Sequence, residues 1–206
     1  MTADDLRKVL AAAAATKWTD VGLLLVALAG LLAAGGAAFI VFQQWRGEHE
    51  RLLKKAAVDL CMDWTRSLDP AIFAVAHLLE SLDGEACRSI EKLDRVVFDS
   101  KKIQLIRNIF NDDIAGDGDK IVIDGHRVLF IRQSAMKYLG LMESVLTAWQ
   151  QGVADRGIIE KLFAPLFQKT KGASGLKMFR IAVGTAFFPA IALFEQTIGA
   201  NAVVLA

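Results

Sequence analysis

The stretch VGLLLVALAGLLAAGGAAFIVF, residues 21–42, decides the fold because it contains no charged side chain. At about 1.5 Å of rise per residue, a helix over this run is about 33 Å long, which is enough to cross the hydrocarbon core of a bilayer. Trp18 precedes the run and Trp45 follows it, and tryptophan is enriched at both membrane–water interfaces. The sequence therefore predicts a transmembrane helix over residues 20–45, with Trp18 and Trp45 as its interface anchors.

A cleaved signal peptide is the alternative interpretation of this run. The apolar region of a signal peptide covers about 7–15 residues and follows a basic start. This run is longer, and it comes after Asp4 and Asp5. Small residues at Ala34, Gly36 and Ala38 resemble a cleavage site, but the length of the run favours a retained anchor.

Positive charge predicts the orientation of the anchor. More lysines and arginines follow the run than precede it: Arg46, Arg51, Lys54, Lys55 and Arg66 come after it, and Arg7, Lys8 and Lys17 come before it. Cytoplasmic flanks carry the excess of basic residues. We therefore expect a single-pass or two-pass membrane protein with a short outer tail (residues 1–19) and the larger part in the cytoplasm.

Small residues recur every four positions inside the predicted span. This spacing places them along one helix face, where a second backbone can approach closely. We expect this ridge to pack against another transmembrane helix, from a second subunit or a second copy of the chain. The ridge, called the small-residue ridge below, consists of Ala29, Gly30, Ala33, Ala34, Gly36, Ala37 and Ala38.

The rest of the chain is expected to be all-α, because it has few prolines and long helix-compatible runs. We predict that the transmembrane helix continues into an antiparallel helical bundle over residues 46–168. Asp69 and Asp155 are candidate helix caps, with Pro70 starting the helix after Asp69. Residues 86–97 show apolar spacing that predicts a continuing helix, and residues 121–123 are a candidate extended piece. Glu143, among apolar neighbours, is expected to bond within the bundle.

Residues 169–206 form the third part, an apolar C-terminal segment that we expect to associate with the membrane. Residues 181–194 are apolar but too short for a full crossing, and a longer crossing would carry Glu195 into the bilayer at about 3 kcal/mol. An interfacial, re-entrant or protein-covered segment is favoured over a second crossing, and a soluble core helix is the third alternative. A basic group before the run is expected to contact anionic head groups: Lys169, Lys171, Lys177 and Arg180.

No motif of known chemistry emerges from the sequence. Residues 113–124 resemble a calcium loop but lack two ligand positions, and the histidines lack metal-site spacing. Cys61 and Cys87 are interpreted as ordinary buried thiols. The net charge of +1 argues against nucleic-acid binding. We expect no metal, no cofactor and no enzymatic activity.

One stretch resembles a known family. The motifs are YLGLME at residues 138–143, GVAD at 152–155 and the aromatic-rich helix over 158–167. They are similar to an uncharacterised bacterial family of membrane-anchored helical domains, a domain of unknown function, and the likeness covers residues 20–168. Met142 stands where an aromatic residue usually precedes the glutamate. The resemblance implies the fold and a location in the bacterial inner membrane, single-pass or two-pass, and it brings no activity.

Three functional hypotheses follow from these features. The favoured one is a membrane-anchored scaffold or accessory subunit, which packs in the membrane and binds a protein through its helical domain. The alternative is a membrane-active effector or pore component that uses residues 181–206. The third is an enzyme with a site of scattered acids, such as Asp113, Asp117, Asp119 and Glu143.

Overall fold

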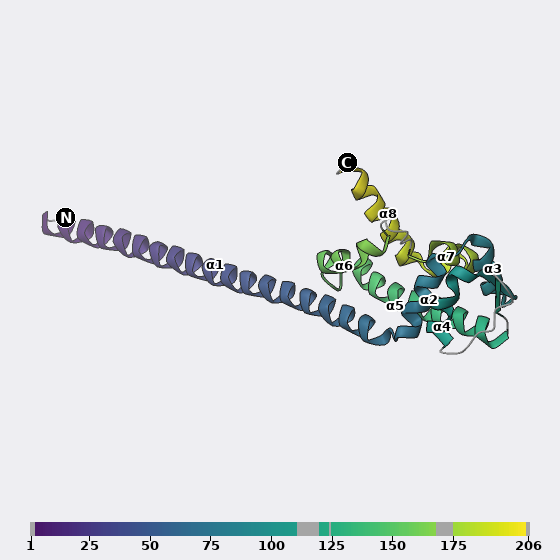
Figure 1. Ribbon diagram of the computed structural model, residues 1–206. Coiled ribbons are helices and arrows are strands. Elements are labelled where there is room, and N and C mark those ends of the chain that lie inside the picture. Colours follow the sequence, from purple (N-terminus) through teal and green to yellow (C-terminus); the bar gives the residue numbers. More distant parts are fainter. Residues whose placement is uncertain (1–2, 111–119, 124, 168–174, 205–206) are drawn as a thin grey trace. The chain divides into compact units, whose positions relative to one another are not determined.

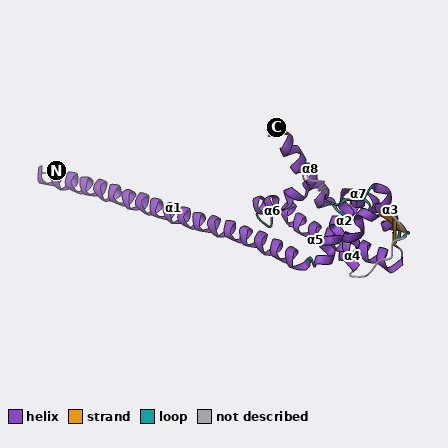
Figure 2. Ribbon diagram, viewed as in Figure 1, coloured by secondary structure: helices purple, strands orange, loops and turns teal. Residues whose placement is uncertain are grey.

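The computed structural model describes residues 3–110, 120–123, 125–167 and 175–204, and they are mostly helical (Figures 1 and 2). The chain divides into two units by its contacts, Met1–Arg51 and Leu52–Ala206. Helix α1, Ala3–Ser67, contributes to both. We call them the N-terminal unit and the C-terminal unit.

The N-terminal unit is the first part of helix α1. Among the described residues, this helix is the one long and apolar enough to cross a membrane, and its apolar window is 0% buried. All side chains from Val26 to Arg51 are exposed to solvent. The prediction of one long apolar helix near the start of the chain is therefore confirmed.

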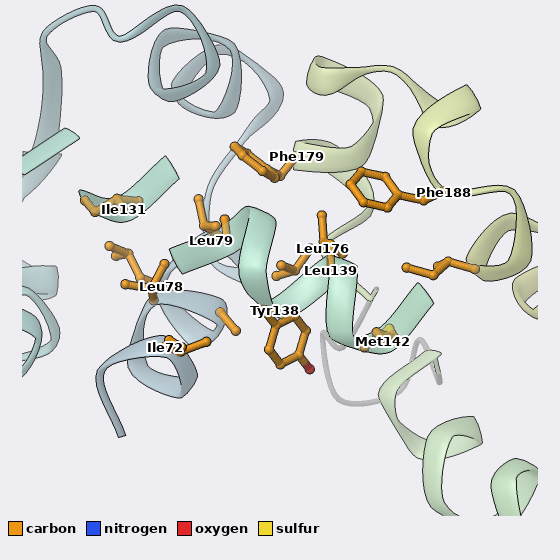
Figure 3. Packing of buried hydrophobic residues seen from close by; sticks show 14 of the residues in the cluster. Ile72, Leu78, Leu79, Ile131, Tyr138, Leu139, Met142, Leu176, Phe179 and Phe188 are labelled. Atoms are coloured by element: carbon orange, nitrogen blue, oxygen red, sulfur yellow. The ribbon is translucent and has the colours of Figure 1, made fainter. Parts of the chain in front are cut away.

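The C-terminal unit is built around helix α5, Gly125–Gln151, which contacts α2, α3 and α8. Its buried side chains recur at steps of three and four and meet apolar residues from both ends of the unit (Figure 3). The other elements are α2 (Pro70–Glu80), α3 (Gly84–Lys92), β1 (Val96–Asp99), η1 (Ser100–Lys102), α4 (Ile103–Phe110), β2 (Lys120–Ile123), α6 (Arg156–Phe163), η2 (Ala164–Phe167), α7 (Lys177–Val183), η4 (Thr185–Phe187) and α8 (Pro189–Val204).

The predicted antiparallel bundle is not confirmed. Helices α2, α3, α4 and α6 have 8 to 11 residues, whereas α5 has 27. Short helices cannot each run the full length of α5, so they cover it piece by piece.

Two predicted helix starts are confirmed by capping hydrogen bonds. The Asp69 carboxylate accepts from the Ile72 amide at 2.8 Å, and Pro70 occupies the first turn of α2. The Asp155 carboxylate accepts from the Ile158 amide at 3.0 Å at the start of α6. Each bond satisfies an amide that the helix itself leaves without a partner.

The predicted continuation of a helix through residues 86–97 is wrong. Leu93 has a left-handed backbone (φ 62°) that ends α3. Strand β1 then pairs antiparallel with β2, and Val97 lies opposite Val122 in this register. The extended piece expected at residues 121–123 is confirmed as part of β2. The fold is thus helical with one two-stranded sheet.

The predicted membrane association of the C-terminal segment is not confirmed, and part of the segment is covered by protein, which was one of the expected alternatives. Gly184 (φ 115°) separates α7 from η4, and α8 begins at Pro189. Phe188, Ile191 and Phe194 are buried in the core, where Phe188 lies near residues of α5 (Figure 3). These buried side chains contact protein and are not free to contact lipid, whereas Ile181 and Phe187 of the same run are exposed.

Candidate interaction surfaces

The small-residue ridge lies on the exposed part of helix α1. Ala29, Gly30, Ala33, Ala34, Gly36, Ala37 and Ala38 are all exposed. A Cβ atom added at Gly30 or Gly36 would meet nothing within 4 Å. No described residue of the chain covers this face, so it is open to another helix.

The two expected interface anchors lie in the same helix. Trp45 is exposed and stacks on the His49 ring, with 6.0 Å between centroids and 14° between planes. Arg46 and Glu50 approach to 3.7 Å one turn apart. Trp18 lies in α1, but its side chain is outside the described part of the structure.

An apolar groove runs between the end of α1 and α6 in the C-terminal unit. Its volume is about 390 Å³. Trp64 of α1 packs edge-on against Phe163 of α6, with 4.9 Å between centroids. The Asp155 amide donates to the Leu53 carbonyl at 3.0 Å, so the two walls are joined. We call this surface the α1–α6 groove; it is lined by Val58, Cys61, Met62, Thr65, Arg66, Ile158 and Leu162.

The groove presents exposed apolar side chains with little polar chemistry. Val58, Met62 and Leu162 are 44%, 45% and 42% exposed. Arg66 is at the rim, where its guanidinium lies 3.8 Å from the Asp63 carboxylate. An apolar surface with a charged rim is typical of protein contact sites. Sequence periodicity did not predict the groove, because α6 approaches α1 through tertiary packing.

An ion-pair network joins α7 to α8. The Arg180 guanidinium donates to the Glu195 carboxylate at 2.8 Å and to the Gly175 carbonyl at 2.8 Å. The Lys177 ammonium donates to the same carboxylate at 3.0 Å. Burial alone would raise the pKa of Glu195, but the hydrogen bonds from Arg180 and Lys177 outweigh it and hold the pKa below its usual range.

This network corrects the predicted role of Arg180. Its side chain is 3% exposed and it lies over the Phe167 ring at 6.0 Å from the centroid. A guanidinium so enclosed does not reach lipid head groups. Lys177 remains half exposed, whereas Lys169 and Lys171 lie outside the described residues.

Glu143 bonds within the fold, as predicted. One carboxylate oxygen accepts from the Ala190 amide at 2.8 Å, and the other accepts from the Ile191 amide at 2.9 Å. These amides are in the first turn of α8, where backbone donors lack partners. Glu143 therefore fixes α8 to α5.

The described residues contain no metal-binding cluster, since no group of three His, Cys, Asp or Glu side chains among them could hold a metal ion. Asp113, Asp117 and Asp119, the candidate acids of the enzyme hypothesis, lie outside these residues. Cys61 and Cys87 are free thiols. Burial, followed by the negative charge of Asp83, raises the pKa of Cys87 to about 11, so this thiol is protonated at neutral pH.

Comparisons with protein-family models, curated proteins and solved structures return no match to this chain. The family resemblance carried by residues 138–143 therefore stays a prediction. The chain's surfaces and contacts are the basis for assigning its function.

Proposed function

We propose that this protein is a non-enzymatic, membrane-anchored scaffold or accessory subunit of a complex in the bacterial inner membrane. The observation that carries the proposal is the part of α1 from Val26 to Phe42, which is apolar and which no described residue of the chain covers. An uncovered apolar helix of this length is unfavourable in water and favourable in a bilayer. The C-terminal unit lies on the cytoplasmic side in this proposal, as the basic residues after the span favour.

Inside the membrane, the small-residue ridge is the proposed contact. Lipid tails are as apolar as the side chains, so helix association there depends on close packing. The open space at Gly30 and Gly36 permits such an approach. The neighbour is another subunit or a second copy.

Outside the membrane, the α1–α6 groove is the proposed protein-binding surface. Its exposed apolar side chains favour a partner that presents an apolar helix or loop. No part of the proposal requires nucleic acid or a cofactor.

Native mass spectrometry of the intact chain in mild detergent tests the scaffold function. We expect a homo-oligomer or a co-purifying membrane protein, and monomers alone would contradict the proposal. Gly30→Leu with Gly36→Leu should weaken the assembly, whereas the matched change Gly35→Leu, in the same span and on the opposite side of the helix, should not.

A groove variant tests the second contact separately. Met62→Asn should lose a partner bound by the C-terminal unit. Phe73→Asn is the control, because Phe73 is 59% exposed on α2 and does not line the groove. If the two variants bind the partner equally well, the groove is not the protein-binding surface. Carbonate extraction tests the anchor: a chain released into the soluble fraction has no transmembrane helix.

The alternative function, a membrane-active effector or pore component, requires the C-terminal segment to leave the core. The burial of Phe188, Ile191 and Phe194 opposes this step, as does the Arg180–Glu195 pair. We therefore favour the scaffold. A permeability change in vesicles that disappears on deletion of residues 176–206 would reverse this preference.

A further inference from the structure

The two walls of the α1–α6 groove run in the same direction. At one end, the Asp155 amide at the start of α6 donates to the Leu53 carbonyl of α1 at 3.0 Å. At the other end, the Trp64 ring packs against Phe163 with 4.9 Å between centroids. The lining residues of α1 span eight steps along the helix, from 58 to 66, which is about 12 Å or about two turns. A third helix fits along a groove between two such helices.

The groove is too open to enclose a small molecule. Small-molecule sites bury about 70–90% of the surface of their ligand. Here the apolar lining residues Val58, Met62 and Leu162 are 44%, 45% and 42% exposed. A small molecule would leave much of this apolar surface in water, whereas a helix lying along the groove covers both walls at once. The groove therefore favours a protein helix as its occupant.

The face of α1 that lines the groove becomes basic one turn earlier in the chain. Lys54 and Lys55 precede Val58 by four and three residues, so they share its helix face. Both lysines are exposed, and the described ion pairs include neither of them. The end of the groove next to the Leu53 carbonyl is therefore bordered by two available cations, and we call it the lysine end.

The acidic side chains of the two walls leave the lysine end positive. On α6, Asp155 caps the helix and Glu160 accepts from an indole N–H at 2.8 Å. On α1, Asp63 lies 3.8 Å from Arg66 at the opposite end of the groove. Asp59 follows a lining residue by one position, which turns it about 100° away around the helix. A partner's carboxylates therefore find complementary charge at the lysine end.

These charges oppose a second copy of the chain as the occupant. In a two-fold pair, each groove would face the same surface of the other copy. With the grooves parallel, Lys54 and Lys55 meet the same lysines of the copy, and like charges facing each other lower the affinity. With the grooves antiparallel, they meet Arg66 and Asp63, which carry no net charge. Neither arrangement supplies the negative charge that the lysine end favours.

We infer that the α1–α6 groove binds an amphipathic helix of a partner protein, with carboxylates at one end of its apolar face opposite Lys54 and Lys55. Apolar residues of that helix at positions i, i+3, i+4 and i+7 fill the groove. This inference rests on the proposed scaffold function and specifies the segment that the scaffold holds. All lining residues and both lysines belong to the C-terminal unit, so the site is complete within it. Apolar contact supplies most of the affinity, and the lysines fix the direction of the bound helix.

Site-specific photo-cross-linking of the full-length chain, in membranes of the organism that encodes it, tests the inference. The photoreactive residue p-benzoylphenylalanine is placed at Met62 or at Leu162, one on each wall of the groove. The control position is Phe73, which is 59% exposed on α2 and does not line the groove. Mass spectrometry identifies the segment joined to each position. We expect both groove positions to join one segment of another protein, with apolar residues three and four apart and Asp or Glu at one end.

A binding measurement then tests the charge. A synthetic peptide of the joined segment is titrated against the full-length chain in mild detergent. Lys54→Gln with Lys55→Gln should weaken binding about 2- to 30-fold, as expected for the loss of two exposed ion pairs. The matched control is Lys92→Gln with Lys101→Gln, which changes two exposed lysines outside the groove and should leave the affinity unchanged.

Several outcomes overturn the inference. They are a cross-link from position 62 to a second copy of the chain, to lipid or to a segment without acidic residues, and a yield no higher than at position 73. Unchanged affinity in the double lysine variant overturns it as well. The proposed function fails separately: a chain that is monomeric in mild detergent, or released by carbonate, removes the scaffold. A carbonate-resistant chain that co-purifies with a membrane protein, without the groove cross-link, removes only this inference.

Discussion

Removing the charge of Glu195 should destabilise the C-terminal unit. Removing one partner of a buried ion pair costs about 3–5 kcal/mol, while exposed pairs contribute about 0–1 kcal/mol. Arg180 is 3% exposed and Glu195 is 29% exposed, so this pair lies between the two cases. In Glu195→Gln, Arg180 keeps its 2.8 Å bond to the Gly175 carbonyl. We therefore expect a loss of about 2 kcal/mol, near the middle of these ranges.

Thermal unfolding of the full-length chain in mild detergent measures this loss. About 2 kcal/mol corresponds to a fall in Tm of about 4–8 °C for a unit of this size. Trp149 is a suitable fluorescent reporter, because its ring packs edge-on against Phe194 of α8 at 5.0 Å between centroids. The matched control is Lys177→Met, since Lys177 is 51% exposed and its loss should cost below about 1 kcal/mol.

A double variant separates the ion pair from other effects. Arg180→Met with Glu195→Gln removes both charges, so no buried guanidinium is left without its carboxylate. We expect the double variant to be less destabilised than the sum of the two single variants. If Glu195→Gln unfolds at the parent temperature, or if the two single effects simply add, the reasoning about a buried pair is wrong.

Three further predictions concern the same region. The pKa of the Glu195 carboxylate is lowered in the folded protein, so its stabilisation is complete above the ordinary pKa of 4.5 and is lost as the pH falls through the lower, folded pKa. Acid should therefore lower the Tm of the parent protein more than the Tm of Glu195→Gln. Parallel plots of Tm against pH for the two proteins would contradict this. Glu143→Ala should cost about 1–2 kcal/mol in urea unfolding, because two amides of α8 lose their acceptor, and an unchanged midpoint would argue against the cap. Gly184→Ala should destabilise the C-terminal unit by about 1 kcal/mol or more, because a backbone φ of 115° strains any residue with a side chain. The control is Gly140→Ala, at an exposed helical position with open space around it. This change should be neutral or stabilising by up to about 1 kcal/mol.

Helix starts could be predicted from the sequence because their signals are local. A cap needs only its own carboxylate and an amide two or three residues later, as at Asp69 and Asp155. The long apolar part of α1 is equally local, since composition and length suffice. These features required no knowledge of the tertiary structure.

Strand β1 could not be predicted in the same way. Four residues are too few for a period to be recognised, and their partner, β2, is reached only after α4. Residues 86, 90, 93 and 97 happen to have helical spacing, but Leu93 adopts a left-handed backbone that glycine usually provides. Pairing with a distant strand overrode the local pattern.

The Arg180–Glu195 pair was missed because the charges of the C-terminal segment were considered one at a time. Arg180 was interpreted as a head-group ligand, and Glu195 as a penalty for membrane crossing. In the fold they bind each other, because Gly184 and Pro189 lie between them and let the chain turn back. The sequence did contain a signal for this pair: Arg180 and Glu195 carry opposite charges at the two ends of an apolar run that is interrupted by Gly184 and Pro189.

The late position of Phe179, Phe188, Ile191 and Phe194 in the chain has a consequence for biogenesis. On the ribosome, α1 emerges first and α5 follows, while these side chains are still unmade. One face of α5 therefore stays exposed until these residues are synthesised, which is later than the time at which α1 leaves the ribosome. The proposed membrane integration of α1 would therefore precede completion of the core. Nascent chains halted before residue 176 should engage chaperones more than those halted in the same way after residue 194 has emerged.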